Sequence, residues 1–251
     1  MNITLIYYTD NCLDETIASF CRKNILEAAD GNPIISVSQK PLDFGENICV
    51  GDIGRNHLSI FKQILAGTQS VKTKYVALVE HDCLYTKEHF NWIPHKDYKF
   101  FYNVNHWIVN WKTGEYFNMG RRKALSQMIC DKELLLKGLN DKISMLEIGA
   151  KILKGQSGAC EFGVVCNDLQ YDEYERYYNI LKSTGKDLGS YSEESFCTTA
   201  PNLDIRHGRN FTGNKKSRNR CFEIPYWGKF KELEKEDDIH TNNQHSNKAS
   251  E

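Results

Sequence analysis

No apolar run in the sequence reaches the roughly 18–20 residues that a helix needs to cross a bilayer. The apolar run from Ile3 to Tyr8 is too short for a signal peptide, and no basic residue precedes it. Nine cysteines are present, yet no two of them form a C-x-x-C pair, and the closest are Cys160 and Cys166. These absences argue against a zinc knuckle or a disulfide framework and predict a cytoplasmic protein.

A strong charge of either sign is lacking as well. The 32 Lys and Arg residues nearly balance the 33 Asp and Glu residues, which leaves a formal net charge of -1 at pH 7. Bulk electrostatic attraction to nucleic acid or to a membrane is therefore excluded, and any polyanion must be bound by a local patch. With 251 residues, of which 40% are hydrophobic, the chain can form one large domain or two small ones.

Strand-like and helix-like segments alternate in the first half of the chain. Apolar, β-rich runs at 3–8, 34–37 and 75–79 are typical of strands covered on both faces. Between them, Asp14 can cap a helix with Ile17, Cys21, Ile25 and Ala28 on one face, and a second helix presents Leu58, Phe61 and Leu65. A loop rich in Gly and Asp is expected at 44–54. This β-α-β-α-β order predicts an α/β fold with a doubly wound, mostly parallel sheet flanked by helices.

The second half is expected to be a mixed α+β region. A strand pair, or one strand with a bulge, is predicted at 100–109, and a turn at Gly114. Helices are predicted at 121–136, 141–154 and 172–182, with a glycine-containing loop at 155–163. We expect a single domain over 1–228, with halves at 1–110 and 111–228. The polar residues 229–251 are expected to form a disordered tail.

An acidic triplet, Glu80-His81-Asp82, follows the third buried strand. In a parallel sheet, ligands sit at the carboxyl ends of the strands, and Asp10 lies just past the first strand. The ends of the two strands are therefore expected to line one crevice. Two carboxylates at this place can hold a hard divalent cation that bridges a diphosphate, although an isolated E-x-D is more often a solvated strand end.

A basic, glycine-containing stretch runs from Leu203 to Arg218. Glycines at 208 and 213 allow backbone amides to approach an anion closely. Arg206, Arg209, Lys215 and Lys216 add positive charge, and His207 offers an imidazole to a metal such as Mn²⁺. The alternative is a solvated basic loop with a histidine held by structural hydrogen bonds.

The segment Gly51 to Asn56 enters the second predicted helix. Arg55 and Asn56 can hold a nucleotide or its phosphates near the helix N-terminus. The alternative is a helix cap with Asp52 or Gly54 at the turn. The segment is neither a Walker loop nor a G-x-G-x-x-G fingerprint.

Together these segments resemble the nucleotide-binding half of GT-A glycosyltransferases. In that family the first strand ends at a Thr or Asp, here Thr9-Asp10, and a G-x-x-R-N-type helix start follows, here Gly51 to Asn56. A later strand ends in a D-x-D-like metal motif, here Glu80-His81-Asp82 with Glu in the first acidic position. The run from Arg206 to Gly213 is similar to one in small glycosyltransferases of bacteria and their viruses, and a viral protein would work in the host cytoplasm.

The resemblance implies a donor that is a nucleoside-diphosphate sugar, with uracil as the expected base, and a Mn²⁺ or Mg²⁺ cofactor. Asp82 and His207 would ligate the metal, and Glu80 would contribute through the metal, a water or the ribose. The implied donor-binding residues are Thr9, Asp10, Asp52, Arg55, Asn56, Glu80, Arg209 and Lys215.

An inverting enzyme also needs a carboxylate that deprotonates the acceptor hydroxyl, whereas a retaining one does not. Glu161 is the first candidate for this base and Glu147 is the second. The alternative for Glu161 is an ordinary glutamate of a surface loop. Trp107, Trp111 and Tyr116 can form a stacking wall for a sugar or nucleobase, but aromatic residues at strand spacing are more often core.

The acceptor and the reaction class both leave alternatives open. The acceptor is a saccharide or a hydroxymethylated DNA base. Such a base would have to be flipped out of a duplex or met in single-stranded DNA. A nucleotidyltransferase on a similar sheet would release pyrophosphate instead. A non-enzymatic module that binds nucleic acid through the patch from Arg206 to Arg220 would show steep salt dependence without metal. The donor sugar and the oligomeric state are not determined by the sequence.

Overall fold

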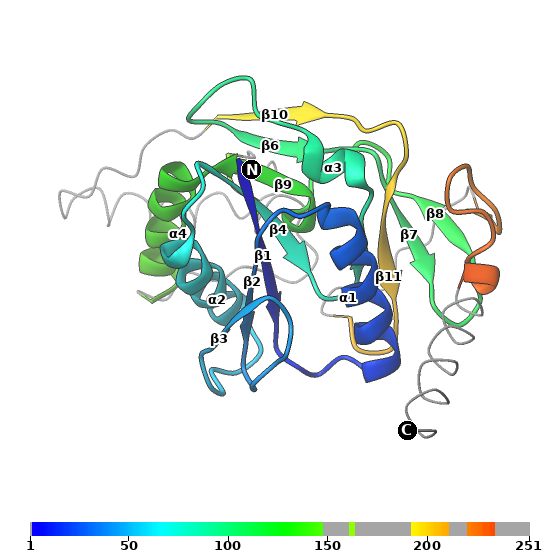
Figure 1. Cartoon of the computed structure of the whole chain (residues 1–251), viewed down its shortest axis with the longest axis horizontal. Helices are drawn as coiled ribbons and strands as arrows, with labels where there is room; N and C mark the ends of the chain where they lie inside the picture. Colours follow the sequence, from blue (N-terminus) through cyan, green and yellow to red (C-terminus); the bar gives the residue numbers. More distant parts are fainter. Residues whose placement is uncertain (1, 148–160, 164–191, 211–219, 234–251) are drawn as a thin grey trace, which may run out of the picture.

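The computed structural model describes residues 2–147, 161–163, 192–210 and 220–233. In these residues the chain forms two sheets, with helices on both faces of the larger one (Figure 1). No helix among the described residues is both long and apolar enough to cross a membrane. The expected helices at 172–182 and beyond Glu147, the loop at 155–160 and most of the expected tail lie outside the described residues.

The N-terminal β-α-β unit forms as its residue pattern predicts. Strand β1 (Ile3–Thr9) is buried throughout, and helix α1 (Glu15–Ala29) follows with Asp14 as its N-cap, because the Asp14 carboxylate accepts a hydrogen bond from Thr16 N. The helix ends at Asp30, which adopts a left-handed conformation. Strand β2 (Ile34–Ser38) then pairs in parallel with β1. Both predicted strands and the predicted helix are confirmed.

The larger sheet has seven strands in the order β10-β6-β9-β4-β1-β2-β3. Helix α2 (His57–Ser70) connects β3 (Glu46–Cys49) to β4 (Tyr75–Glu80), which lies beside β1 in parallel. Strands β6 (Phe100–Asn103) and β10 (Glu193–Phe196) extend the sheet beyond β9 (Met128–Asp131). All its strands except β9 run in the same direction, so the predicted mostly parallel α/β sheet is confirmed.

The smaller sheet has five strands in the order β12-β8-β7-β11-β5. They are β5 (Cys83–Leu84), β7 (His106–Asn110), β8 (Tyr116–Asn118), β11 (Asn202–Arg206) and β12 (Arg220–Cys221). Strand β11 runs parallel to β7 and antiparallel to β5. Because β5 follows β4 directly, the two sheets meet beside the carboxyl end of β4 (Figure 1).

Three apolar clusters hold these layers together. Alternate residues of β1 and β4 face α2 and α4 (Lys132–Glu147) on one side of the larger sheet, and α1 and α3 (Lys87–Asn91) on the other (Figure 1). Helix α1 also packs against the smaller sheet through Ile17 and Cys21. The two sheets thus share α1 in their cores.

The structure corrects four sequence-based expectations. The loop predicted at 44–54 contains strand β3, and the strand pair predicted at 100–109 is divided between the two sheets as β6 and β7. The helix predicted at 121–136 is wrong in its first part, where a 3-10 turn, η1 (Leu125–Gln127), and strand β9 precede α4. Phe230 is fully buried in the cluster around the smaller sheet, so packed chain continues past the expected boundary at 228.

A buried histidine predicts an acid-sensitive fold. His89 is fully buried among aromatic rings, its Nε2 has no hydrogen-bond partner in the described residues, and burial lowers its pKa to about 3. The unfolded chain, with the ordinary pKa of about 6.5, binds the extra proton first. Between pH 6.5 and pH 3 the folded state therefore loses stability as the pH falls, by up to about 1.4 kcal/mol per pH unit.

The measurement is the free energy of unfolding in urea across that pH range for wild type and His89→Leu. We expect a shallower loss of stability with acid in the variant, whose side chain cannot be protonated. Parallel slopes for the two proteins would contradict this assignment. Exposed His95→Leu serves as the matched control, with a slope close to that of wild type.

Candidate active site at the carboxyl edge of the parallel sheet

The parallel register of β1 and β4 brings two predicted segments together. Tyr8 lies opposite Glu80, and Tyr8 OH donates a 2.7 Å hydrogen bond to Glu80 Oε1. One residue further, Thr9 Oγ1 and His81 Nδ1 share a 2.7 Å hydrogen bond, and His81 Nδ1 lies 3.9 Å from Asp10 Oδ1. The ends of these two strands therefore lie side by side, as the sequence predicts.

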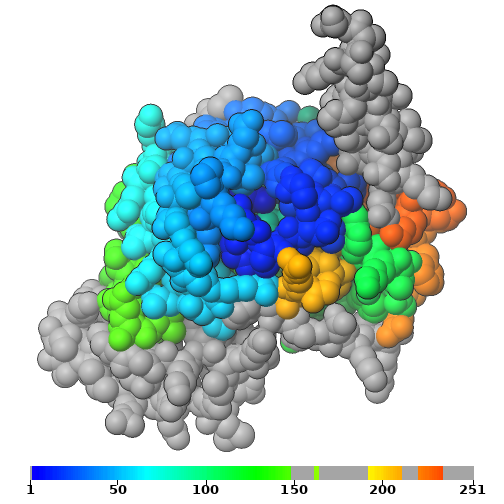
Figure 2. All heavy atoms as spheres, turned by 90° about the horizontal axis from the view of Figure 1, so that it is seen from below, coloured from blue at the N-terminus to red at the C-terminus, as the bar shows by residue number. Residues whose placement is uncertain are grey.

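The face of the molecule at which these strands end is hollowed. Figure 2 shows the hollow where the dark-blue N-terminal segment meets the lighter blue segment around residues 40–56 and the amber segment that ends near residue 210. These are the three parts of the chain in which the sequence places the donor site.

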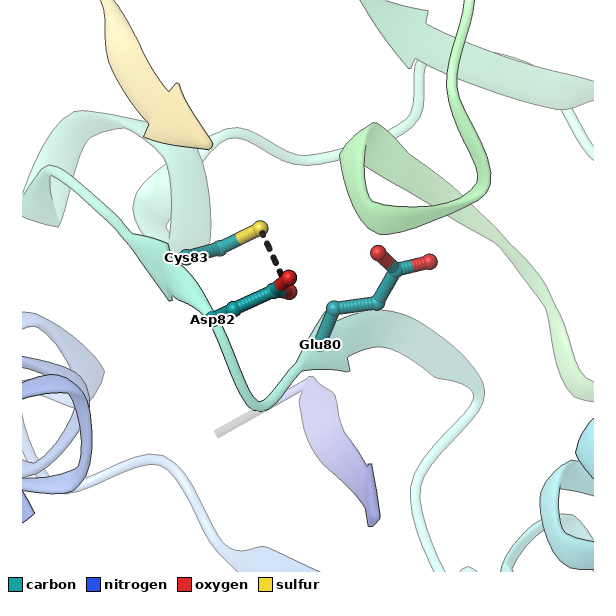
Figure 3. A group of neighbouring side chains, drawn as sticks. All are labelled: Glu80, Asp82 and Cys83. Atoms are coloured by element: carbon teal, nitrogen blue, oxygen red, sulfur yellow. Dashed lines mark hydrogen bonds between the residues drawn. The ribbon is translucent and has the colours of Figure 1, made fainter. Parts of the chain in front are cut away.

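Glu80, Asp82 and Cys83 form the one group of possible metal ligands found among the described residues. Their ligand atoms lie within 4.8 Å of one another. In Figure 3 the three side chains point into the same space from the end of β4 and the start of β5. Carboxylate oxygens suit Mn²⁺ and Mg²⁺.

The two carboxyl groups of this site have pKa values shifted in opposite directions. Burial, followed by the charges of Asp82 and Asp204, raises the pKa of Glu80 to about 8. Burial also acts to raise the pKa of Asp82, but the hydrogen bond from His207 and the nearby His81 hold it below its usual value. At neutral pH Glu80 is therefore mostly protonated, and a bound cation would favour ionisation of both carboxylates. The donor set therefore fits a hard divalent metal ion.

His207 reaches this group from a distant part of the chain. Strand β11 pairs with β5 so that Ile205 N donates a 2.8 Å hydrogen bond to Asp82 O, and His207 follows two residues later. His207 Nε2 lies 3.2 Å from Asp82 Oδ2, and Asn210 Nδ2 donates to the same oxygen at 3.0 Å. His207 Nδ1 accepts a 3.2 Å hydrogen bond from Arg209 N. In the neutral ring the proton is therefore on Nε2, which donates a hydrogen bond to Asp82 Oδ2.

Two arginines cross the mouth of the crevice. Arg55 Nε lies 2.7 Å from Asp10 Oδ2, and an Arg55 Nη2–H donates to the backbone oxygen of Arg209. Arg209 Nη1 in turn donates to Cys12 O at 2.6 Å. These contacts tie together three segments that lie far apart in the sequence.

The side chains of Asp52 and Asn56 accept hydrogen bonds from backbone N–H groups of their own segment. Gly54 N donates to Asp52 Oδ1 at 3.1 Å, and Ser59 N donates to Asn56 Oδ1 at 3.0 Å, which makes Asn56 the N-cap of α2. The alternative drawn from the sequence, a helix cap at this turn, is therefore realised at Asn56. Both side chains remain exposed at the rim.

Glu161 lies close to the metal-ligand group. Phe162 is fixed to β6 because Tyr102 OH donates to Phe162 O at 2.8 Å and accepts from Phe162 N at 2.7 Å. The charge of the neighbouring Glu161 contributes to the raised pKa of Glu80. Glu147, the second candidate base, is instead paired with Lys62 at 2.9 Å on the exposed side of α2 and α4. Lys215 lies outside the described residues.

The predicted aromatic wall is wrong. Tyr116 is buried in the cluster between the smaller sheet and α1, and Trp107 and Trp111 pack against that cluster. Alternation along β7 points their rings away from the side that carries His106 and Ile108. Tyr116 is thus a core residue of the smaller sheet, and Trp107 and Trp111 are half-buried against that core.

Several residues of the site were not assigned from the sequence. Tyr8, His81, Asn210, Asp204 and Cys83 all contact or face the predicted ligands. For Tyr8 and His81 the signal was available, because strand alternation and the parallel register of β1 and β4 place them beside Glu80 and Thr9. For the other three, the pairing of β5 with β11 had to be known.

No family model matches the sequence, and no curated protein matches it. Solved structures do match. One is a glycosyltransferase involved in glycosylation of the major capsid of PBCV-1, with 11% identity, a TM-score of 0.41, and coverage of 81% of this chain and 92% of that chain.

In two further matches the aligned region covers about half of the matched protein's chain. The mannosyltransferase PcManGT of Pyrobaculum calidifontis, solved with GDP-Man and Mn²⁺, has 11% identity and a TM-score of 0.42, over 82% of this chain and 56% of that chain. The bifunctional IspDF of Campylobacter jejuni has 13% identity and a TM-score of 0.35, over 61% and 49%. At these TM-scores the likeness carries no argument about the reaction, so the chemistry is inferred from the site itself.

Proposed function

We propose that the protein is a metal-dependent glycosyltransferase that takes its sugar from a nucleoside-diphosphate sugar. The observation that carries this proposal is the convergence of Glu80 and Asp82 at the carboxyl edge of the parallel sheet, with Arg55 and Arg209 at the mouth of the same crevice. A diphosphate leaving group needs a divalent cation and further positive charge, and this site offers a place for both.

Glu80 and Asp82 would hold Mn²⁺ or Mg²⁺, which supplies neutralisation of the charge on the departing nucleoside diphosphate. His207 is the proposed third ligand. Its Nε2 can bind a metal only when the ring proton resides on Nδ1, where the backbone N–H of Arg209 now donates. Metal binding at His207 therefore requires the turn from His207 to Asn210 to adjust, while in the described arrangement His207 and Asn210 orient Asp82.

The nucleoside is proposed to lie over the end of β1, with uracil as its base. Thr9, Asp10 and Arg55 face the crevice there, and Asp52 and Asn56 shape the loop at its rim. Hydrogen bonds from Cys12 and the charges of His81 and Arg55 lower the pKa of Asp10 although burial opposes this, so Asp10 stays ionised at neutral pH. Arg209, and in our proposal Lys215, would bind the diphosphate.

Glu161 is proposed as the base that accepts the proton of the acceptor hydroxyl in an inverting reaction. This proposal is supported by the charge of Glu161, which acts on Glu80, and by the hydrogen bonds between Tyr102 OH and the backbone of the adjacent Phe162. A retaining reaction would leave Glu161 without this role, and the anomeric configuration of the product distinguishes the two cases.

The proposal is tested by incubating the protein with a panel of nucleotide sugars in the presence of Mn²⁺. We expect release of a nucleoside diphosphate from at least one donor, loss of that release when EDTA is added, and its return when Mn²⁺ is restored in excess. Undiminished release after metal removal and dialysis would contradict the metal-dependent reaction.

The identity of the released product separates the competing functions. Pyrophosphate in place of a nucleoside diphosphate would indicate a nucleotidyltransferase. Metal-independent, steeply salt-dependent binding of DNA with no donor turnover would indicate a nucleic-acid-binding module.

A further inference from the structure

One side of the smaller sheet faces the metal-ligand group. The register of its strands sets Cys83, Asp204, Ile108, Phe117 and Arg220 side by side in one row across all five strands. Side chains in such a row point to the same side of a sheet. Cys83 is adjacent to Asp82, so this row of side chains starts at the proposed metal site and continues across the sheet to Arg220.

His106 lies on this side of the sheet and is buried with an unsatisfied ring nitrogen. It is 1% exposed, and its Nδ1 has no hydrogen-bond partner among the described residues. Its position on β7, two residues before Ile108, points it to the side of Asp204, and the charges of Asp204, Arg122 and Arg206 act on its ring. Buried polar atoms without a partner are rare, so a bound group is expected to complete this one.

Asp204 is the second polar group of this surface. Its Oδ1 accepts a 3.1 Å hydrogen bond from Cys83 Sγ, and the residue is only half-buried. A carboxylate has about four acceptor positions, so Asp204 can accept further bonds from hydroxyl groups. Its charge also reaches Glu80, as the raised pKa of Glu80 shows.

We propose that this side of the smaller sheet, carrying Asp204 and His106, is the acceptor subsite and that it takes a neutral, hydroxyl-rich acceptor, a saccharide. The inference rests on the proposed glycosyltransferase function. Asp204 binds acceptor hydroxyls as a hydrogen-bond acceptor, and His106 Nδ1 binds one more. Both residues position the acceptor beside the metal-ligand group.

The charge of the surface argues against a polyanionic acceptor. With Glu80 and Asp82 holding the metal ion, the carboxylates of Glu161 and Asp204, whose charges both act on Glu80, remain to repel a phosphodiester backbone.

Of the described arginines of the basic stretch, Arg206 lies on the same side of β11 as Asp204, and its charge acts on His106, whereas Arg209 and Arg220 lie elsewhere. Arg209 donates to Cys12 O at the mouth, whereas Arg220 lies 3.2 Å from Glu115 and covers the ring of Phe117 at 5.3 Å. In the described residues Arg209 and Arg220 are thus engaged at separate places of the molecule and do not form a continuous track for a nucleic-acid backbone.

The experiment compares transfer with donor hydrolysis. Wild type, Asp204→Asn and His106→Leu are given the donor that wild type hydrolyses, with Mn²⁺, and either water alone, a panel of methyl glycosides and disaccharides, or an oligonucleotide with hydroxymethylcytosine. We expect wild type to glycosylate at least one neutral saccharide and not the oligonucleotide. Asp204→Asn should lose at least about tenfold in transfer, the value of one hydrogen bond to a charged group, and in both variants the loss of transfer should exceed any change in hydrolysis to water.

Ile205→Val is the matched control, because Ile205 lies on the opposite side of the same strand, in the core. A thermal melt of each variant establishes that it is folded. Asp204→Asn keeps the side-chain volume, so it tests the proposal even if His106→Leu fails to fold.

Three results would overturn the inference and leave the donor reaction standing. They are modification of the oligonucleotide, use of no saccharide by a wild type that hydrolyses its donor, and an equal loss of hydrolysis and transfer in Asp204→Asn. Absence of donor hydrolysis in wild type would instead refute the proposed function on which the inference rests.

Discussion

Replacement of Asp82 by Asn should lower donor turnover about 10³-fold and abolish tight Mn²⁺ binding, since a metal ligand is worth several kcal/mol in the stabilised leaving group. The neutral amide oxygen can still accept the hydrogen bonds that His207 and Asn210 donate to Asp82 Oδ2 at 3.2 and 3.0 Å. The fold should therefore be retained. Steady-state turnover, with Mn²⁺ binding measured by calorimetry, checks both expectations.

Asp97→Asn is the matched control for this variant. Asp97 is an exposed carboxylate that pairs with Lys74 at 2.7 Å, away from the crevice, so its loss should leave turnover and metal binding unchanged. Activity close to wild type in Asp82→Asn would place the metal site elsewhere and would remove the main support for the proposed function.

Asn202→Leu should destabilise the protein by about 3 kcal/mol and lower its melting temperature by roughly 10 °C. Asn202 is fully buried, its Oδ1 accepts from Thr86 N at 3.0 Å, and its Nδ2 donates to Gln127 Oε1 at 2.7 Å. Leucine has a similar size but leaves both partners buried without a bond, which costs about 1–3 kcal/mol for each. The two sheets should loosen where they meet.

Thermal melts and urea unfolding of Asn202→Leu measure this effect. Asn140→Leu is the control, because Asn140 is exposed on α4 and its amide donates only to Leu136 O in its own helix. Equal melting temperatures for wild type and Asn202→Leu would show that the junction of the two sheets does not depend on this side chain.

The elements of the first half were predictable because their information is local. In β1 and β4 a continuous apolar run marks a strand buried on both faces, and in α1 the spacing of Ile17, Cys21, Ile25 and Ala28 matches one face of a helix. Asp14 and Asp30 then mark the ends of α1. Each of these signals lies within a few residues of the element it defines.

Strand β9 could not be predicted in the same way. Its four residues, Met128–Asp131, are all buried between β4 and β6, to which they pair antiparallel. An apolar run this short fits a buried helix as well as a strand, and α4 begins directly after it. The pairing partner, more than 50 residues away along the chain in β4, decides the conformation.

In the candidate site, too, some residues could be predicted from local sequence signals and others depended on long-range strand pairing. The sequence alone set Thr9, Asp10, Glu80 and Asp82 at one edge of a parallel sheet, because strands connected by helices must run the same way and end together. Only the tertiary structure decided that His207 reaches Asp82, 125 residues earlier in the chain, and that Asp204 and His106 face the same ligands. The pairing of β11 with β5 and β7 makes these contacts, and such long-range pairing leaves no periodic pattern in the sequence.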